Sequence, residues 1–109
     1  MKKKKPVLKK LTGSKSFKRL LAGIPSTAGM KSGYVILKPG ESVGEHKTEA
    51  KEEAIIILDG EAQVSCSGKV LFTAPKRNLV YIPPETVHDI KNNASKPLRY
   101  VYVVSPLQP

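Results

Sequence analysis

Two histidines and one glutamate have residue types and spacing suited to a metal site. His46 and His88 are the chain's two histidines, and Glu53 begins an apolar run. Alternate residues of a strand share one face, so an inward Glu53 places Ile55 and Ile57 on an apolar floor beside it. Two imidazoles and one carboxylate that leave open coordination positions suit non-haem iron and similar divalent metals. We therefore predict that His46, Glu53 and His88 hold a metal.

Short runs rich in β-branched and aromatic residues predict the strands that position these side chains. Asp59-Gly60 and Ser67-Gly68 have the composition of hairpin turns, because glycine accepts a positive φ. Residues 7–22 are too broken for a helix, and 23–33 has turn composition. A chain of short strands without a helix predicts an all-β sandwich or barrel. The predicted strands are 33–38, 43–48, 53–58, 61–66, 69–74, 78–82, 87–91 and 98–105.

The segments around the two histidines resemble the paired motifs of the cupin superfamily. The first motif has glycine, histidine, glutamate and glycine in order, and the second has proline, histidine and asparagine. The matching residues are Gly40, His46, Glu53 and Gly60, then Pro83, His88 and Asn92. The resemblance covers about residues 40–92. It implies a double-stranded β-helix (the cupin or jelly-roll barrel), often dimeric, with a metal or ligand inside.

Two positions depart from the cupin pattern. Thr48 stands where the family has its second histidine, and Glu85 where it has a motif glycine. Thr48 is expected to line the pocket and to contact a bound water or ligand. Glu52 is a rival to Glu53, but the six residues between Glu53 and Gly60 favour Glu53 and place Glu52 on the outer face. Asn92 is expected to cap the turn after its strand.

The resemblance implies a small cupin that binds a divalent metal and a small molecule inside the barrel. Iron, manganese, nickel and zinc are not distinguished. Oxygenase, isomerase, epimerase and decarboxylase chemistry all fit, because a fold does not choose a reaction. The alternative is a non-catalytic small-molecule-binding or sensor cupin that keeps the barrel without the metal. The sequence does not decide whether the protein is an enzyme.

The positive charge is concentrated at the start of the chain. The net charge is +10, and residues 1–20 hold nine Lys/Arg and no acid, so 21–109 is nearly neutral. We predict a basic, partly disordered N-terminal segment over 1–20 and a single cupin barrel domain over 21–109. The segment could contact nucleic acid phosphates non-specifically, but a nearly neutral body predicts no specific nucleic-acid recognition.

Three further features bear on partners and compartment. Apolar runs of five residues at most predict neither a membrane span nor a signal peptide. Cys66 is the only cysteine, which excludes intrachain disulfides and cysteine-based metal clusters. We therefore expect a cytoplasmic protein. Ala54–Leu58 is apolar at every position, so both faces of that strand are expected to be covered, the outer one by a second subunit in a homodimer.

Overall fold

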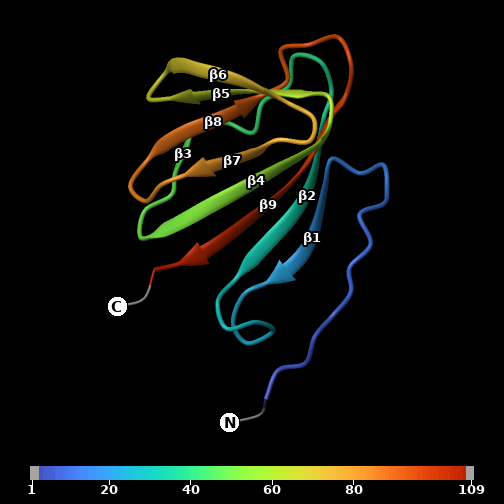
Figure 1. Ribbon diagram of the computed structural model, residues 1–109, viewed down its shortest axis with the longest axis vertical. Helices are drawn as coiled ribbons and strands as arrows, with labels where there is room; N and C mark the ends of the chain where they lie inside the picture. Colours follow the sequence, from blue (N-terminus) through green and yellow to red (C-terminus); the bar gives the residue numbers. More distant parts are fainter. Residues whose placement is uncertain (1–2, 108–109) are drawn as a thin grey trace.

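The computed structural model describes residues 3–107 as two antiparallel β-sheets (Figure 1). Lys2 of the basic segment and residues 108–109 lie outside this range. One sheet has the order β1-β2-β9-β4-β7 and the other β3-β8-β5-β6. The strands are β1 (Phe17–Ala22), β2 (Lys31–Leu37), β3 (His46–Lys47), β4 (Lys51–Asp59), β5 (Glu61–Cys66), β6 (Lys69–Pro75), β7 (Leu79–Ile82), β8 (Val87–Lys91) and β9 (Leu98–Pro106).

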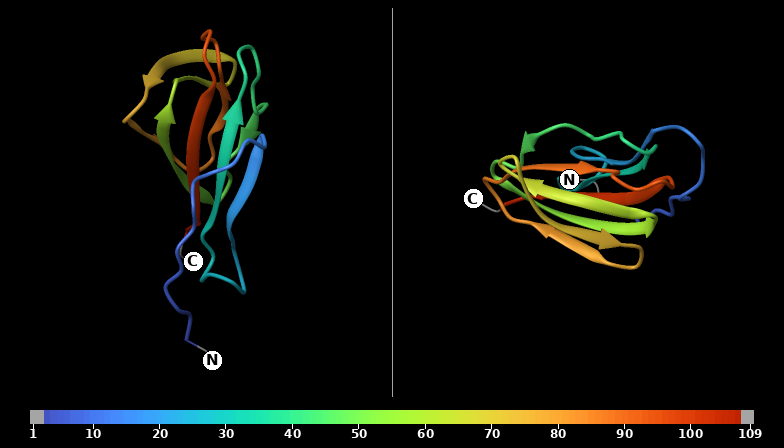
Figure 2. Two further views of the ribbon diagram at one scale, coloured as in Figure 1. Left: turned by 90° about the vertical axis from the view of Figure 1, so that its right-hand side faces the viewer. Right: turned by 90° about the horizontal axis from the view of Figure 1, so that it is seen from above.

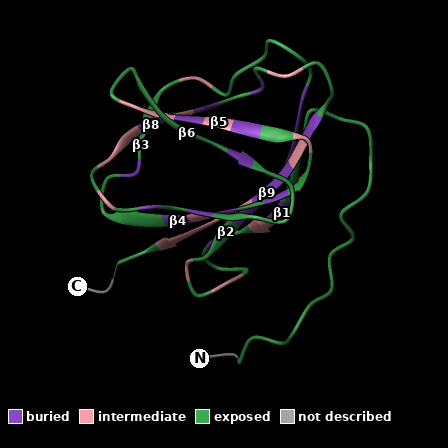
Figure 3. Ribbon diagram, turned by 45° about the horizontal axis from the view of Figure 1, so that its top comes forward, coloured by how far each residue is buried: buried purple, intermediate pink, exposed green. Residues whose placement is uncertain are grey.

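The core lies between the two facing sheets (Figure 2). β4 shows the alternation that builds it, since Glu53, Ile55 and Ile57 are buried while Ile56 and Leu58 are exposed. Residues of both sheets fill the interior, and the burial colouring follows them along the strands (Figure 3). The all-β, double-stranded β-helix prediction is confirmed. No helix between residues 3 and 107 is long and apolar enough to cross a membrane.

β1 is a strand that the sequence analysis did not predict. It pairs antiparallel with β2 at the edge of the five-stranded sheet. The stretch Phe17–Ala22 mixes cations with apolar residues, and a β-bulge after Arg19 breaks its alternation, so no strand pattern is visible in the sequence. The boundary drawn between residues 20 and 21 therefore falls inside a strand of the barrel.

The two predicted hairpin turns have different outcomes. Ser67-Gly68 joins β5 to β6 in one sheet, with Cys66 opposite Lys69, which confirms the hairpin. The hairpin at Asp59-Gly60 is wrong, because β4 and β5 belong to different sheets. Gly60 has φ 78°, and a side chain there would run into the Pro97 carbonyl oxygen, so this corner both turns and packs tightly.

The strand predicted over 43–48 is reduced to the two residues of β3. The preceding loop is held to β8 by isolated hydrogen bonds and not by a continuous β-ladder. Val43 N–H donates to the Ile90 carbonyl, and Gly44 N–H donates to the Asp89 carboxylate at 3.0 Å. Gly44 itself has φ 91°, outside the strand region. These bonds to β8 position the loop so that His46, which follows it, lies opposite His88.

Candidate metal centre

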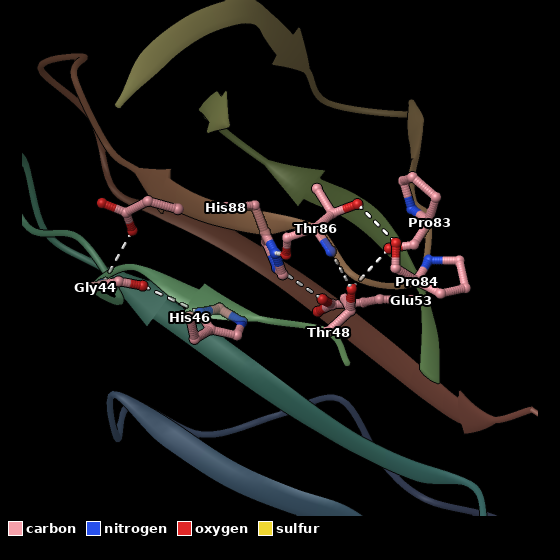
Figure 4. A network of polar contacts seen from close by, with 9 residues as sticks. Gly44, His46, Thr48, Glu53, Pro83, Pro84, Thr86 and His88 are labelled. Carbon is pink, nitrogen blue, oxygen red and sulfur yellow. Dashed lines mark hydrogen bonds and ion pairs between the residues drawn. The ribbon is translucent and has the colours of Figure 1, made fainter. Parts of the chain in front are cut away.

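The three predicted ligands come together (Figure 4), with Glu53 and His88 buried in the barrel and His46 exposed at its surface. β3 carries His46 and β8 carries His88, directly opposite each other in the register, with ring centroids 4.1 Å apart. β4 supplies Glu53 from the other sheet. One donor atom from each residue lies within 4.8 Å of the others. Residues 46, 53 and 88 thus converge from three strands and both sheets.

Glu53 and His88 form a buried pair. The His88 Nε2 and Glu53 Oε1 atoms are 2.9 Å apart, and the exposed fractions of the residues are 0% and 7%. Burial by itself lowers the pKa of His88. The bonds to Glu53 and to the Thr86 carbonyl, with the charges of Glu53 and Asp89, raise that pKa by more, so the net shift is upward. Without a metal, a proton on Nε2 links the two side chains.

Both imidazoles are oriented by backbone carbonyls two residues earlier in the chain. His46 Nδ1 lies 3.1 Å from the Gly44 carbonyl oxygen, and His88 Nδ1 lies 3.1 Å from that of Thr86. An Nδ1–H that donates to a carbonyl leaves Nε2 as the metal-binding atom, and such outer contacts are typical of ligating histidines. With the buried Glu53 carboxylate, these nitrogens form a donor set that fits a divalent metal.

A cavity of about 730 Å³ opens onto this cluster. His46 and Glu53 line it together with aliphatic residues such as Val35 and Ile90. Tyr100 also lines it, and burial followed by the Glu53 charge raises the pKa of its hydroxyl above the ordinary value. The Tyr100 hydroxyl is a neutral hydrogen-bond donor at neutral pH, as a tyrosine ordinarily is, and the shift extends this to higher pH. The size and the mainly apolar walls suit a small organic ligand.

The family model of the cupin domain matches residues 33–104. The chain belongs to the cupin family. The cupin is 31% identical over 88 residues to "Polyketide synthase CurC" of Streptomyces cyaneus, covering 78% of this chain and 56% of that protein. It is 30% identical over 88 residues to "Tetracenomycin polyketide synthase protein TcmJ" of Streptomyces glaucescens, covering 78% and 58%. The chain thus spans less than two thirds of either relative.

Solved structures share the fold at lower identity. The cupin domain of Cnp3 from Schizosaccharomyces pombe superposes with a TM-score of 0.73 at 21% identity, covering 84% of this chain and 64% of that one. A double-stranded β-helix protein from Klebsiella pneumoniae reaches a TM-score of 0.74 at 18% identity, covering 94% and 91%. At this identity the likeness establishes the architecture alone.

Thr48, which replaces the second histidine of the cupin motif, is buried and hydrogen-bonded to the chain itself. Its hydroxyl donates to the Pro83 carbonyl at 2.7 Å and accepts from the Thr86 N–H at 3.0 Å. The residue is 7% exposed and lines the cavity. The hydroxyl hydrogen and one oxygen lone pair of Thr48 are already used in these two bonds. A water or ligand in the cavity could therefore only donate a hydrogen bond to the remaining lone pair.

The neighbouring carboxylates of β4 separate as the alternation predicts. Glu53 points into the barrel, whereas Glu52 is exposed on the outer face and accepts a 2.8 Å hydrogen bond from the Tyr81 hydroxyl. Asn92 is fully buried and ties three backbone groups. Its amide donates to the carbonyls of Leu37 and Lys96, and its oxygen accepts from the Ala94 N–H. The predicted turn-capping role of Asn92 is confirmed.

Sequence reasoning missed the outer part of the cavity. Phe17 and Arg19 of β1 line it, as does Tyr102 of β9. β1 itself was not predicted, so no sequence signal placed its inward residues beside the motif residues. The structure also sets Cys66 on β5 opposite His88 in the register, a proximity that local sequence does not reveal.

Proposed function

We propose that this cupin binds a divalent metal through His46, Glu53 and His88, and a small molecule in the cavity above it. The observation that carries the proposal is the convergence of two oriented imidazoles and one buried carboxylate within 4.8 Å, with His46 and Glu53 lining the cavity. In the metal-free protein a proton on His88 Nε2 pairs with the Glu53 carboxylate, and a bound divalent metal would take the place of that proton. Iron, manganese, nickel and zinc are all accepted by this donor set.

The arrangement supports an enzyme of oxygenase or isomerase type. Three protein ligands leave coordination positions for water and a ligand, where a bound metal would supply Lewis-acid or oxygen-binding chemistry. The chain's own groups would hold the ligand: Tyr100 would donate a hydrogen bond from its neutral hydroxyl, and the aliphatic side chains would contact the apolar part of the ligand. The names of the two curated relatives make a polyketide one ligand to include in a substrate screen.

The second candidate is a non-catalytic cupin that binds or senses a small molecule. Thr48 supports this second function, because it replaces the second histidine of the cupin motif and its hydroxyl is hydrogen-bonded to Pro83 and Thr86. A ligand-dependent rise in melting temperature that EDTA leaves unchanged favours this function. A rise that needs the metal favours the enzyme.

Metal titration of matched glutamine variants tests the site. Untagged, EDTA-treated protein is titrated with Mn²⁺, Ni²⁺ and Zn²⁺ in a calorimeter, and Fe²⁺ is added under anaerobic conditions. We expect one site per chain, weakened at least tenfold in Glu53→Gln. Glu52→Gln is the control, because it makes the same change one residue away on the outer face. Equal affinities of the two variants would contradict the proposal.

We propose a second copy of this cupin as a further partner. The outer face of β4 and β7 exposes four large side chains, namely Ile56 (40%), Leu58 (38%), Leu79 (68%) and Tyr81 (57%). The register places Ile56 beside Leu79, so the two strands share one continuous apolar area. A self-association that covers this face would bury the exposed apolar side chains of β4 and β7.

A further inference from the structure

The outer part of the cavity contains an aromatic wall made by Phe17 of β1 and Tyr102 of β9. The two rings lie 6.4 Å apart between centroids and 21° from parallel, and both line the cavity. β2 runs between their strands. Its Gly33 faces Arg19 on one side and Tyr102 on the other. The wall therefore spans three strands across a position that has no side chain.

Gly33 is what allows the two rings to meet. A Cβ at this position would lie 2.6 Å from Phe17 Cε1 and 2.6 Å from Tyr102 Cε2, closer than carbon atoms approach. The backbone of Gly33 has no positive φ, so the glycine is required for space and not for conformation. Any larger residue would push the rings apart or into the cavity. The aromatic wall thus depends on glycine at position 33.

Arg19 adds a fixed positive charge to the aromatic wall. Its guanidinium carbon lies 5.1 Å from the centre of the Phe17 ring, and Nη1 donates to the Tyr102 hydroxyl at 3.2 Å. These two contacts hold the planar guanidinium over the Phe17 ring and against the Tyr102 hydroxyl. The remaining guanidinium N–H groups can pair with a carboxylate or another planar oxyanion.

The charges around the cavity favour an anion. Lys31 and Lys51 line it together with Arg19, and the ion pairs found among residues 3–107 involve neither these two lysines nor Arg19. Lys47, by contrast, is paired with Glu85 at 3.2 Å. Glu41 and Glu53 line the cavity as well, so four cations (Arg19, Lys31, Lys47 and Lys51) stand against two carboxylates, and the balance is positive. An anion entering the cavity therefore meets attraction and an aromatic surface together.

We propose that the aromatic wall and Arg19 form a subsite for a planar, conjugated anion, such as an aromatic carboxylate or a phenolate. The flat part of the ligand lies against Phe17 and Tyr102, and its charged group pairs with Arg19. This inference rests on the proposed small-molecule function of the cavity. It names the ligand class, and none of the subsite residues is a proposed metal ligand.

Three small probes separate the ring from the charge. 2-Naphthoate has both, 2-naphthalenemethanol has the rings alone, and cyclohexanecarboxylate has the charge alone. Binding is measured by calorimetry to the full chain in EDTA, so that metal coordination contributes nothing. We expect 2-naphthoate to bind one per chain and at least tenfold more tightly than either of the other probes. Equal binding of 2-naphthoate and 2-naphthalenemethanol, or no binding of 2-naphthoate, would overturn the proposal.

Variants then locate the binding. Arg19→Gln is expected to weaken 2-naphthoate about tenfold and Gly33→Ala several-fold, with circular dichroism and melting used to verify the fold. Lys18→Gln is the matched control, since this neighbouring cation is exposed and lies on the opposite face of β1. Unchanged affinity in both Arg19→Gln and Gly33→Ala would refute the subsite. Metal affinity should be the same in all three variants, so a failed metal site and a failed subsite are distinguishable.

Discussion

Replacement of Thr48 by valine tests whether this residue supports the structure or the metal. Valine keeps the shape but removes the hydroxyl that donates to Pro83 and accepts from Thr86. Each lost hydrogen bond costs about 1 kcal/mol, and more where its partner stays buried and unpaired. Pro83 is exposed, so water can replace the hydroxyl there, and Thr86 is half-buried. We therefore expect Thr48→Val to lower the free energy of unfolding by about 2 kcal/mol.

The assay is equilibrium unfolding in urea with EDTA present, together with thermal melting. An unfolding entropy typical of a chain of this size converts 2 kcal/mol into a fall of about 9 °C in Tm. Thr48→Ser keeps the hydroxyl and should lose less than about 1 kcal/mol, since it removes a single methyl group. Metal affinity in Thr48→Val should stay within threefold of the wild type. Unchanged stability combined with a large loss of metal affinity would refute this reasoning.

Three further predictions concern strain, pH and association. Glu85 has φ 55° where the cupin motif has glycine, so Glu85→Gly should stabilise the fold by about 0.5–1 kcal/mol in urea unfolding, whereas Glu85→Gln, which keeps the strain, should not. The raised pKa of His88 means that protonation favours the metal-free fold. Its contribution is complete below about pH 6.5 and is lost as pH rises through the folded pKa; a flat stability profile from pH 6 to 8 in EDTA would contradict the Glu53–His88 link. Leu79→Lys should shift the protein toward monomer in sedimentation velocity, while Val7→Lys, at a similarly exposed position, should not; a wild type that is already monomeric would exclude the second copy.

Local patterns predict much of the barrel because strand alternation is a local property. Period-two alternation from Glu53 onwards separates the inward Glu53 from the outward Glu52, and the structure agrees. The same rule cannot say which strands pair. Asp59-Gly60 has hairpin composition, yet the strands on its two sides belong to different sheets. β4 pairs with β9 and β5 pairs with β8, so the two do not pair with each other. Turn residues predict where the chain bends, but they do not predict which strand the following strand pairs with.

The inner part of the site could be predicted better than the outer part, because its residues lie in local motifs. His46 and His88 lie in recognisable motifs, so their meeting could be predicted. Thr48 lines the cavity as the motif position predicts, but its hydrogen-bond partners lie in a loop 35 to 38 residues away and could not be predicted from the sequence. Phe17 and Tyr102 lie near opposite ends of the chain and are joined through Gly33, whose role becomes visible only when β1, β2 and β9 are side by side.

A crystal structure of the protein grown with Mn²⁺ or Ni²⁺, with anomalous data collected at the metal edge, tests the central claim most directly. The account predicts one anomalous peak in the barrel, at about 2.0–2.2 Å from Nε2 of both histidines and from a Glu53 carboxylate oxygen. The Nδ1 atoms should stay on the carbonyls of Gly44 and Thr86. A stoichiometric metal bound elsewhere, or an intact Glu53–His88 hydrogen bond with no peak at saturating metal, would contradict it.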